Sequence, residues 1–299
     1  MTLEFHTLDV FTQSPFTGNP LAVVLGAEVL SAAQMQTLAR EFNLSETIFV
    51  QPPQNPAHTA RVRIFFPTAE IPFAGHPTIG CAILLASQRQ PEGDFTAHLV
   101  LEEEAGLVPV RVTRQGSRLE AEFTAPQLPV AAPGTAPRAL IAAALDLTPE
   151  EIGFAAHSPG LWQAGPAFLY VPLRDLESLG RARPIEPHWS ALMDSAGVDS
   201  AYLYTPGTEC DFRARMFSPT AGIPEDPATG SATAILAAQL RAARVLRQGS
   251  QSFTLRQGVE MGRASDLVLS VDYSAEGITA MRIKGSAVPV SQGRIRIPA

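Results

Sequence analysis

Two turns in the sequence combine residue types that could bind a small anion. Gly75 and His76 begin one apolar stretch, and Gly230 and Ser231 begin another. If each stretch is a helix, its first N–H groups are unpaired and carry a partial positive charge, which attracts a carboxylate. A simpler interpretation is that Thr229 and Ser231 only cap their helix. The presence of two such turns favours a pocket for a small carboxylic acid.

One carboxylate could move a proton beside these turns, and a second lies close to both helix starts. Glu46 follows Ser45 and opens a strand pattern at residues 47–50, and Asp226 lies in the segment EDPATGS. In a cleft without water the pKa of a carboxyl group rises, so that it becomes a usable acid or base near neutral pH. The simpler interpretations are a solvated strand end for Glu46 and a turn before Pro227 for Asp226.

The elements that must position these residues come from an internal duplication. RVRIFFPTAEIP at residues 61–72 and RARMFSPTAGIP at residues 213–224 match at eight of twelve positions, with an offset of 152. Each copy leads into a stretch that is apolar on nearly every side, at residues 77–87 and 231–246. Such stretches are typical of buried helices.

The duplication also shows where the two copies differ. With a three-residue insertion in the second copy, His76 aligns with Ser231, so the fold itself does not require histidine there. Upstream, Glu46 aligns with Ser200, so that only the first copy offers a proton carrier. Downstream, Gly106 aligns with Gly258 at the offset of 152.

These patterns predict an α+β protein of two pseudo-symmetric domains, each a curled, mostly antiparallel sheet around a buried helix. The Pro- and Ala-rich segment near the middle places the boundary between 1–127 and 128–284, and the strand pattern at 285–299 completes the first domain. We expect His76 and Ser231 to meet across a cleft between the domains.

Composition excludes several classes of function. The net charge of −7 without a basic run argues against nucleic-acid binding. The longest apolar run, residues 79–86, is shorter than the ~20 residues of a membrane span, and no secretory signal is visible. The two cysteines have neither disulfide nor metal-ligand spacing. We therefore expect a cytoplasmic protein without metal or organic cofactor.

Five segments, taken together, resemble the PhzF-like (phenazine biosynthesis) family: DVFTQSPFTGNPLAVV (9–24), NLSETIFV (43–50), EIPFAGHPTIG (70–80), RMFSPTAGIPEDPATGSA (215–232) and QGVEMGR (257–263). The resemblance implies the diaminopimelate-epimerase-like fold, an active site between two domains, no cofactor and a homodimer. It also implies that Glu46 moves the proton, and that His76, Asp226 and Ser231 hold the substrate or assist the transfer. The neighbouring candidates for substrate binding are Ser45, Gly75, Thr229 and Gly230.

The leading interpretation is an isomerase that shifts a proton in a small cyclic carboxylic acid. A two-base racemase or epimerase on the same fold is an alternative. That chemistry requires a cysteine at both helix starts, whereas Cys81 and Cys210 lie elsewhere in the sequence. The other alternative is a protein that binds a small acid without turning it over. The physiological substrate and pathway stay open.

Overall fold

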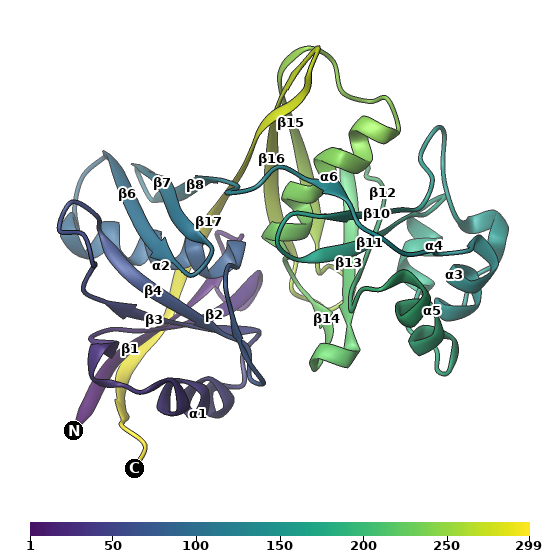
Figure 1. Ribbon diagram of the computed structural model, residues 1–299. Helices are drawn as coiled ribbons and strands as arrows, with labels where there is room; N and C mark the ends of the chain where they lie inside the picture. Colours follow the sequence, from purple (N-terminus) through teal and green to yellow (C-terminus); the bar gives the residue numbers. More distant parts are fainter. The chain divides into compact units, whose positions relative to one another are not determined.

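The computed structural model describes residues 1–299, with the exception of the side chain of Ala221, and divides into two compact units (Figure 1). Unit 1 consists of Met1–Pro126 and Arg282–Ala299, and unit 2 consists of Gln127–Met281. The long strand β17 (Gly277–Arg296) therefore contributes residues to both units.

Unit 1 is built mainly of strands. Besides its part of β17, its elements in chain order are β1 (Thr2–Val10), β2 (Asn19–Val24), the 3₁₀ helix η1 (Ala27–Val29), α1 (Ala32–Phe42), β3 (Glu46–Gln51), β4 (Ala60–Phe65), β5 (Glu70–Ile71), α2 (Gly75–Arg89), β6 (Phe95–Glu103), β7 (Gly106–Gln115) and β8 (Arg118–Thr124).

The strands of unit 1 form a closed ring of hydrogen-bonded pairs. The order is β1, β2, β3, β4, β6, β7, β8 and β17, and β17 pairs again with β1. Only the pairs β2–β3 and β4–β6 in this ring are parallel, and each of these connections carries a helix, as a crossover requires. Closure of the sheet leaves this ring without a free edge strand.

Helix α2 lies inside this ring, where it contacts β1, β2, β3, β6, β7 and β8 (Figure 1). Its residues from Gly75 to Leu84 are all buried, which explains why the sequence is apolar all round rather than on one stripe. At Gly80, a Cβ atom would lie 2.5 Å from Cδ2 of Leu21 and 2.8 Å from Cγ2 of Val10. Glycine at this position lets the helix approach the strands closely.

Helix α1 covers the outside of the ring. Ser31 and Gln34 form a capping box at its start, in which each side chain accepts a hydrogen bond from the backbone N–H of the other. Its apolar face packs on side chains of β2, β3 and β4, including Phe49 and Phe65. The buried members of this cluster are Leu3, Val24, Ala27, Leu30, Met35, Leu38, Ala39, Phe49 and Phe65.

Unit 2 has more helices. Its elements in chain order are β9 (Val130–Ala131), α3 (Arg138–Ala144), the 3₁₀ helix η2 (Pro149–Glu151), β10 (Gly160–Gln163), β11 (Ala167–Pro172), α4 (Leu176–Arg181), α5 (His188–Ala196), β12 (Ala201–Pro206), β13 (Phe212–Ser218), the 3₁₀ helix η3 (Pro219–Ala221), β14 (Ile223–Asp226), α6 (Gly230–Ala242), β15 (Gly249–Gln257), β16 (Ser265–Ser274) and the start of β17.

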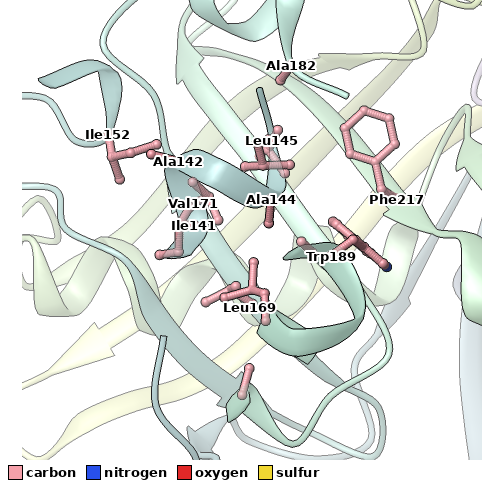
Figure 2. Packing of buried hydrophobic residues seen from close by; sticks show 14 of the residues in the cluster. Ile141, Ala142, Ala144, Leu145, Ile152, Leu169, Val171, Ala182, Trp189 and Phe217 are labelled. Carbon is pink, nitrogen blue, oxygen red and sulfur yellow. The ribbon is translucent and has the colours of Figure 1, made fainter. Parts of the chain in front are cut away.

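Side chains of β11 and β12 alternate between the two faces of the unit 2 sheet, as the two-residue period of a strand dictates. Leu169 and Val171 join the apolar cluster formed with α3 and α5, which Figure 2 shows around Trp189 and Phe217. Tyr170, between them, points to α6 and donates its hydroxyl to the carbonyl of Ala232 at 2.6 Å. The sheet therefore separates the outer helices from the buried helix α6.

Both units pair their strands in the same order. Unit 1 has β2–β3 parallel, β3–β4 antiparallel, β4–β6 parallel and β6–β7 antiparallel. Unit 2 has β11–β12, β12–β13, β13–β15 and β15–β16 with the same alternation. The expected mixed, mostly antiparallel sheet with a buried helix is present in each unit, whereas the symmetry between them stays a prediction.

The two buried helices differ in extent from the sequence prediction. Helix α2 starts two residues earlier and ends two residues later than residues 77–87. Helix α6 ends at Ala242 rather than at residue 246, because Arg244 adopts a left-handed backbone conformation with φ of 59°. None of the helices in the described part of the chain has the length and apolarity to cross a membrane.

We predict that Gly80→Ala lowers the free energy of unfolding by about 1–3 kcal/mol, because the added methyl group overpacks the space beside Leu21 and Val10. This loss should exceed the gain of about 1 kcal/mol in helix propensity. The matched control is Gly180→Ala in α4, where no other described heavy atom lies within 4 Å of the added Cβ. Urea denaturation should show a stability equal to or above wild type for Gly180→Ala; an equal loss in both variants contradicts the packing argument.

Candidate functional site

In unit 1, Glu46 and His76 lie side by side. Glu46 is the first residue of β3 and His76 the second residue of α2, and Nδ1 of His76 is 3.1 Å from Oε2 of Glu46. Their side chains are only 10% and 2% exposed. We call this pair the Glu46 cluster. Two other candidates adjoin it in sequence, since half-buried Ser45 precedes the strand and Gly75 starts the helix.

His76 is a neutral imidazole at neutral pH. Burial lowers its pKa to about 3, and the nearby carbonyl of Pro20 opposes this shift only in part. Its Nε2 atom is buried and has no hydrogen-bond partner among the residues that the structure describes. A histidine with so low a pKa is a poor proton acceptor but can still exchange a hydrogen bond with a ligand.

The strand register agrees with the alignment of Glu46 and Ser200. Thr47 pairs with Phe65 across β3 and β4, and Ala201 pairs with Phe217 across β12 and β13. Phe65 and Phe217 are 152 positions apart, so the residues before Thr47 and Ala201 correspond. The hydroxyl of Ser200 donates to Oγ of Ser218 at 2.8 Å, which is a structural contact.

In unit 2, Asp226 and Thr229 form a second cluster, which we call the Asp226 cluster. Asp226 ends β14 and is 5% exposed, and its Oδ2 accepts a hydrogen bond of 2.5 Å from the hydroxyl of Thr229. Gln257, at the end of β15, donates to the carbonyl of Asp226 at 2.7 Å. The Asp226 side chain is thus held in a buried turn.

Neither buried helix has a side-chain cap at its N-terminus. The residues before the first turns are Ala74 in α2 and Thr229 in α6, and neither side chain accepts a hydrogen bond from its helix. Ser231 is the second residue of α6 and half-buried, behind Gly230. The interpretation that Thr229 and Ser231 serve as side-chain caps is therefore wrong. The first N–H groups of both helices are left without this partner.

An arginine–glutamate pair at the same position in both units braces the hairpin that leads to each helix. Arg63 donates two hydrogen bonds to Glu70, both of 2.6 Å. Arg215, which lies 152 positions later, donates to both oxygens of Glu225 at 2.8 and 2.9 Å. Each guanidinium also lies over the ring of a phenylalanine two residues further along its strand. Glu225 directly precedes Asp226.

The two pairs differ in burial. The side chains of Arg215 and Glu225 are 9% and 15% exposed, against 22% and 32% for Arg63 and Glu70. Arg215 also donates to the carbonyls of Leu179, at 2.9 Å, and Ala182, at 2.8 Å, at the end of α4. The more buried pair lies in unit 2, which also contains the Asp226 cluster.

Sequence reasoning missed Gln257 and its counterpart Glu103. The ladders pair Ala60 with Leu101 and Phe212 with Leu255, so Glu103 and Gln257 occupy equivalent positions. The alignment of Gly106 with Gly258 is wrong in this register, because the turn after β6 is shorter than the loop after β15. Only the pairing of the strands reveals the equivalence.

Glu103 is a buried carboxyl group beside α2. It accepts a hydrogen bond of 2.7 Å from the hydroxyl of Thr78, and its Oε2 atom has no hydrogen-bond partner among the described residues. Burial raises its pKa to about 8, and the Thr78 hydroxyl opposes the shift. Glu103 is therefore uncharged at neutral pH.

The cysteines do not lie at the helix starts. Cys81 is buried within α2, and burial raises the pKa of its thiol. Cys210 precedes β13, burial raises its pKa as well, and its Sγ donates to the carbonyl of Phe212 at 3.1 Å. Among the described residues, no group of three or more His, Cys, Asp or Glu side chains could hold a metal ion.

Comparison with known proteins shows to which family the chain belongs. The family model described as phenazine biosynthesis-like protein matches residues 8–293. The chain belongs to this family. The resemblance to PhzF-like proteins found in the sequence is thus confirmed.

Two relatives of this family member are named isomerases. An uncharacterized isomerase of Mesorhizobium japonicum is 41% identical over 302 residues, which cover 99% of both chains. The trans-2,3-dihydro-3-hydroxyanthranilate isomerase of Pseudomonas aeruginosa is 35% identical over 291 residues, or 97% of this chain and 98% of that one. The crystal structure of the Bacillus anthracis phenazine biosynthesis protein of the PhzF family has a TM-score of 0.86 at 23% identity, covers 99% and 100% of the two chains, and shows the shared fold.

We predict that Arg215→Ala lowers the free energy of unfolding by about 3 kcal/mol or more, because it leaves Glu225 partly buried without its partner. The matched control is Arg63→Ala, which removes the more exposed pair and should cost less than about 1 kcal/mol. Urea denaturation of both variants measures the difference. Equal losses would show that burial does not distinguish the two pairs.

A second prediction concerns pH. The folded chain holds a proton on Glu103 up to a pKa of about 8, whereas the unfolded chain releases it near the ordinary value of 4.5. Its contribution to stability is therefore full below pH 4.5 and is lost as the pH rises to about 8, by up to about 1.4 kcal/mol per pH unit. Glu103→Gln should remove this slope in denaturation midpoints measured across that range; parallel curves for the two proteins would refute it.

Proposed function

We propose that this chain is a cofactor-independent isomerase that shifts a proton in a small cyclic carboxylic acid by acid/base catalysis at Glu46. The observation that carries the proposal is the placement of a nearly buried carboxyl group 3.1 Å from a neutral histidine, at the uncapped N-terminus of a buried helix. The names of the relatives support the reaction class.

In the proposed reaction, the carboxylate of Glu46 removes a proton from a carbon conjugated to a carboxylate or carbonyl group. The electron pair of the broken C–H bond enters the conjugated system, and the negative charge spreads toward the substrate carboxylate. Glu46 then returns the proton to another carbon, so that no electron acceptor is needed. The helix N–H groups stabilise the charge as it develops.

The low pKa of His76 argues against its imidazole as the proton carrier in this cluster. The pKa of His76, lowered to about 3, makes its imidazole a weak base, and a general base works best with a pKa closer to the working pH. His76 instead orients the substrate through its Nε2 atom, which lacks a protein partner among the described residues.

We further propose that the Asp226 cluster acts on the same substrate as the Glu46 cluster. Asp226 and Ser231 orient the substrate or assist the transfer, with Thr229 and Gly230 beside them. Ser45 and Gly75 have the same supporting role in unit 1. The uncapped start of α6 supports this assignment, since it supplies a second set of N–H groups for an anion.

The substrate class follows from these groups and from one relative. Two helix starts suit an anionic acid, and the Pseudomonas aeruginosa relative is named for trans-2,3-dihydro-3-hydroxyanthranilate, a cyclic carboxylic acid. We propose this compound as the first substrate to test, and a homodimer as the active form, which sedimentation at micromolar concentration would test.

Two other functions are less well supported. A two-base racemase with cysteine at both helix starts does not fit this chain, because Cys81 is buried inside α2 and His76 and Ser231 occupy the starts. A protein that only binds a small acid would have no need of a buried carboxyl group beside a neutral histidine, and the exchange experiment below distinguishes it from an enzyme.

We predict that Glu46→Gln lowers turnover by about a hundred- to ten-thousandfold, because it keeps the shape of the side chain but removes the proton carrier. The measurement is deuterium incorporation from D₂O into trans-2,3-dihydro-3-hydroxyanthranilate and its product, followed by NMR, with the Kd measured in parallel. The affinity should change far less than the rate. The matched control is Glu103→Gln, a buried carboxyl of the same unit, which should exchange at the wild-type rate.

The same assay separates the remaining outcomes. His76→Ala and Ser231→Ala should weaken binding and rate together, because these residues hold the substrate. Exchange that persists in Glu46→Gln but disappears in Asp226→Asn or His76→Ala would reassign the proton carrier. Binding of the acid to the wild-type protein without any exchange would favour the non-catalytic alternative.

A further inference from the structure

Gln257 uses both ends of its side-chain amide to hold the turn that carries Asp226. Nε2 donates to the carbonyl of Asp226 at 2.7 Å and to the hydroxyl oxygen of Thr229 at 3.0 Å. Oε1 accepts from the backbone N–H of Thr229 at 3.2 Å. The residue is fully buried, so water does not compete for these bonds. Gln257 thus reaches across from β15 to β14 and the start of α6.

These bonds determine the direction of the next one. The hydroxyl of Thr229 has a single hydrogen, and its oxygen already accepts from Gln257. Its hydrogen is therefore directed to Oδ2 of Asp226, at 2.5 Å. The bond stabilises the ionised form of the carboxyl group and fixes its rotation. In the resulting chain of hydrogen bonds, Gln257 donates to Thr229 and Thr229 donates to Asp226.

We propose that Gln257 is a positioning residue that sets the orientation and charge of Asp226 through the hydroxyl of Thr229. The inference rests on the proposed function, in which Asp226 holds the substrate, but the chain of hydrogen bonds stands without it. Gln257 does not reach a substrate itself; it acts through Thr229 and the backbone of Asp226.

The equivalent residue of unit 1 shows that the fold does not require an amide at this position. Glu103 occupies the same place in the strand register and is also buried. It accepts from Thr78, on the body of α2, and not from the residue before the helix. The last residue of this strand is therefore a carboxylic acid, Glu103, in unit 1 and an amide, Gln257, in unit 2. The amide is in the unit where the carboxylate of Asp226 has to be positioned.

An amide is the side chain that suits this place. A carboxylate at residue 257 would lose both donated bonds and would set a negative charge beside Asp226. Tyr202 of β12 also faces this turn; burial raises its pKa, with a contribution from the charge of Asp226. Gln257 donates and accepts without titrating, so it adds no charge of its own to the turn.

The test is a titration of the Asp226 carboxyl group, which needs no substrate. The full chain is labelled with ¹³C at the aspartate carboxyl carbons, and the signal absent from Asp226→Asn is assigned to Asp226. We expect Gln257→Glu to raise the midpoint of that signal by about one pH unit or more, with two coupled steps, because two carboxyl groups then share one buried turn. The matched control, Glu103→Gln, should leave the midpoint unchanged.

Substitutions of Thr229 keep the inference testable if Gln257→Glu does not fold. Thr229→Val removes the hydroxyl and should raise the Asp226 midpoint, whereas Thr229→Ser keeps it and should titrate like the wild type. Equal midpoints in wild type, Gln257→Glu and Thr229→Val would overturn the inference. A shift that Thr229→Ser shares with Thr229→Val would overturn it as well, since the hydroxyl would then not be the cause.

An activity measurement separates this inference from the proposed function. In Gln257→Glu the rate of deuterium exchange should fall by roughly tenfold for each pH unit above the pKa of the introduced carboxyl group, whereas the wild type should show no such decline over the same range. If Glu46→Gln abolishes exchange but Gln257→Glu keeps the wild-type titration and pH profile, only the role of Gln257 fails. If the titration shifts but the wild type exchanges nothing, only the proposed function fails.

Discussion

The structure depends on one constraint: a helix that is buried on every side must begin in the protein interior. The first N–H groups of an α-helix have no partner within the helix, and at these two helices no capping side chain supplies one. The turns before α2 and α6 must therefore bring polar groups to these points. Glu46 and His76 gather at one, and Asp226 and Thr229 at the other.

A shared order of strand pairings brings different side chains to these equivalent points. Position 46 carries a carboxyl group in unit 1 and its counterpart, Ser200, carries a hydroxyl that bonds another serine. What stays the same is the bracing of the hairpin, since Arg63 and Arg215 each hold a glutamate through both oxygens. The bracing is repeated in both units, whereas the carboxyl group at position 46 is present in unit 1 only.

Burial determines the protonation of the groups around the helix starts. The imidazole of His76 and the carboxyl of Glu103 are both neutral at pH 7, because the interior disfavours whichever form is charged. Their neutrality leaves the partial positive charge of the α2 N-terminus uncompensated by either side chain.

The sequence by itself determined the family, the internal repeat, the two buried helices and the residues at their starts, because all of these are local patterns or spacings along the chain. Only the tertiary structure decided that Nδ1 of His76 lies beside Glu46, that Thr229 turns its hydroxyl to Asp226 and not to its helix, and that Glu103 and Gln257 are equivalent. Hydrogen-bond direction and strand register depend on residues far apart in the chain. Because the turns after β6 and β15 differ in length, a constant sequence offset could not find that register.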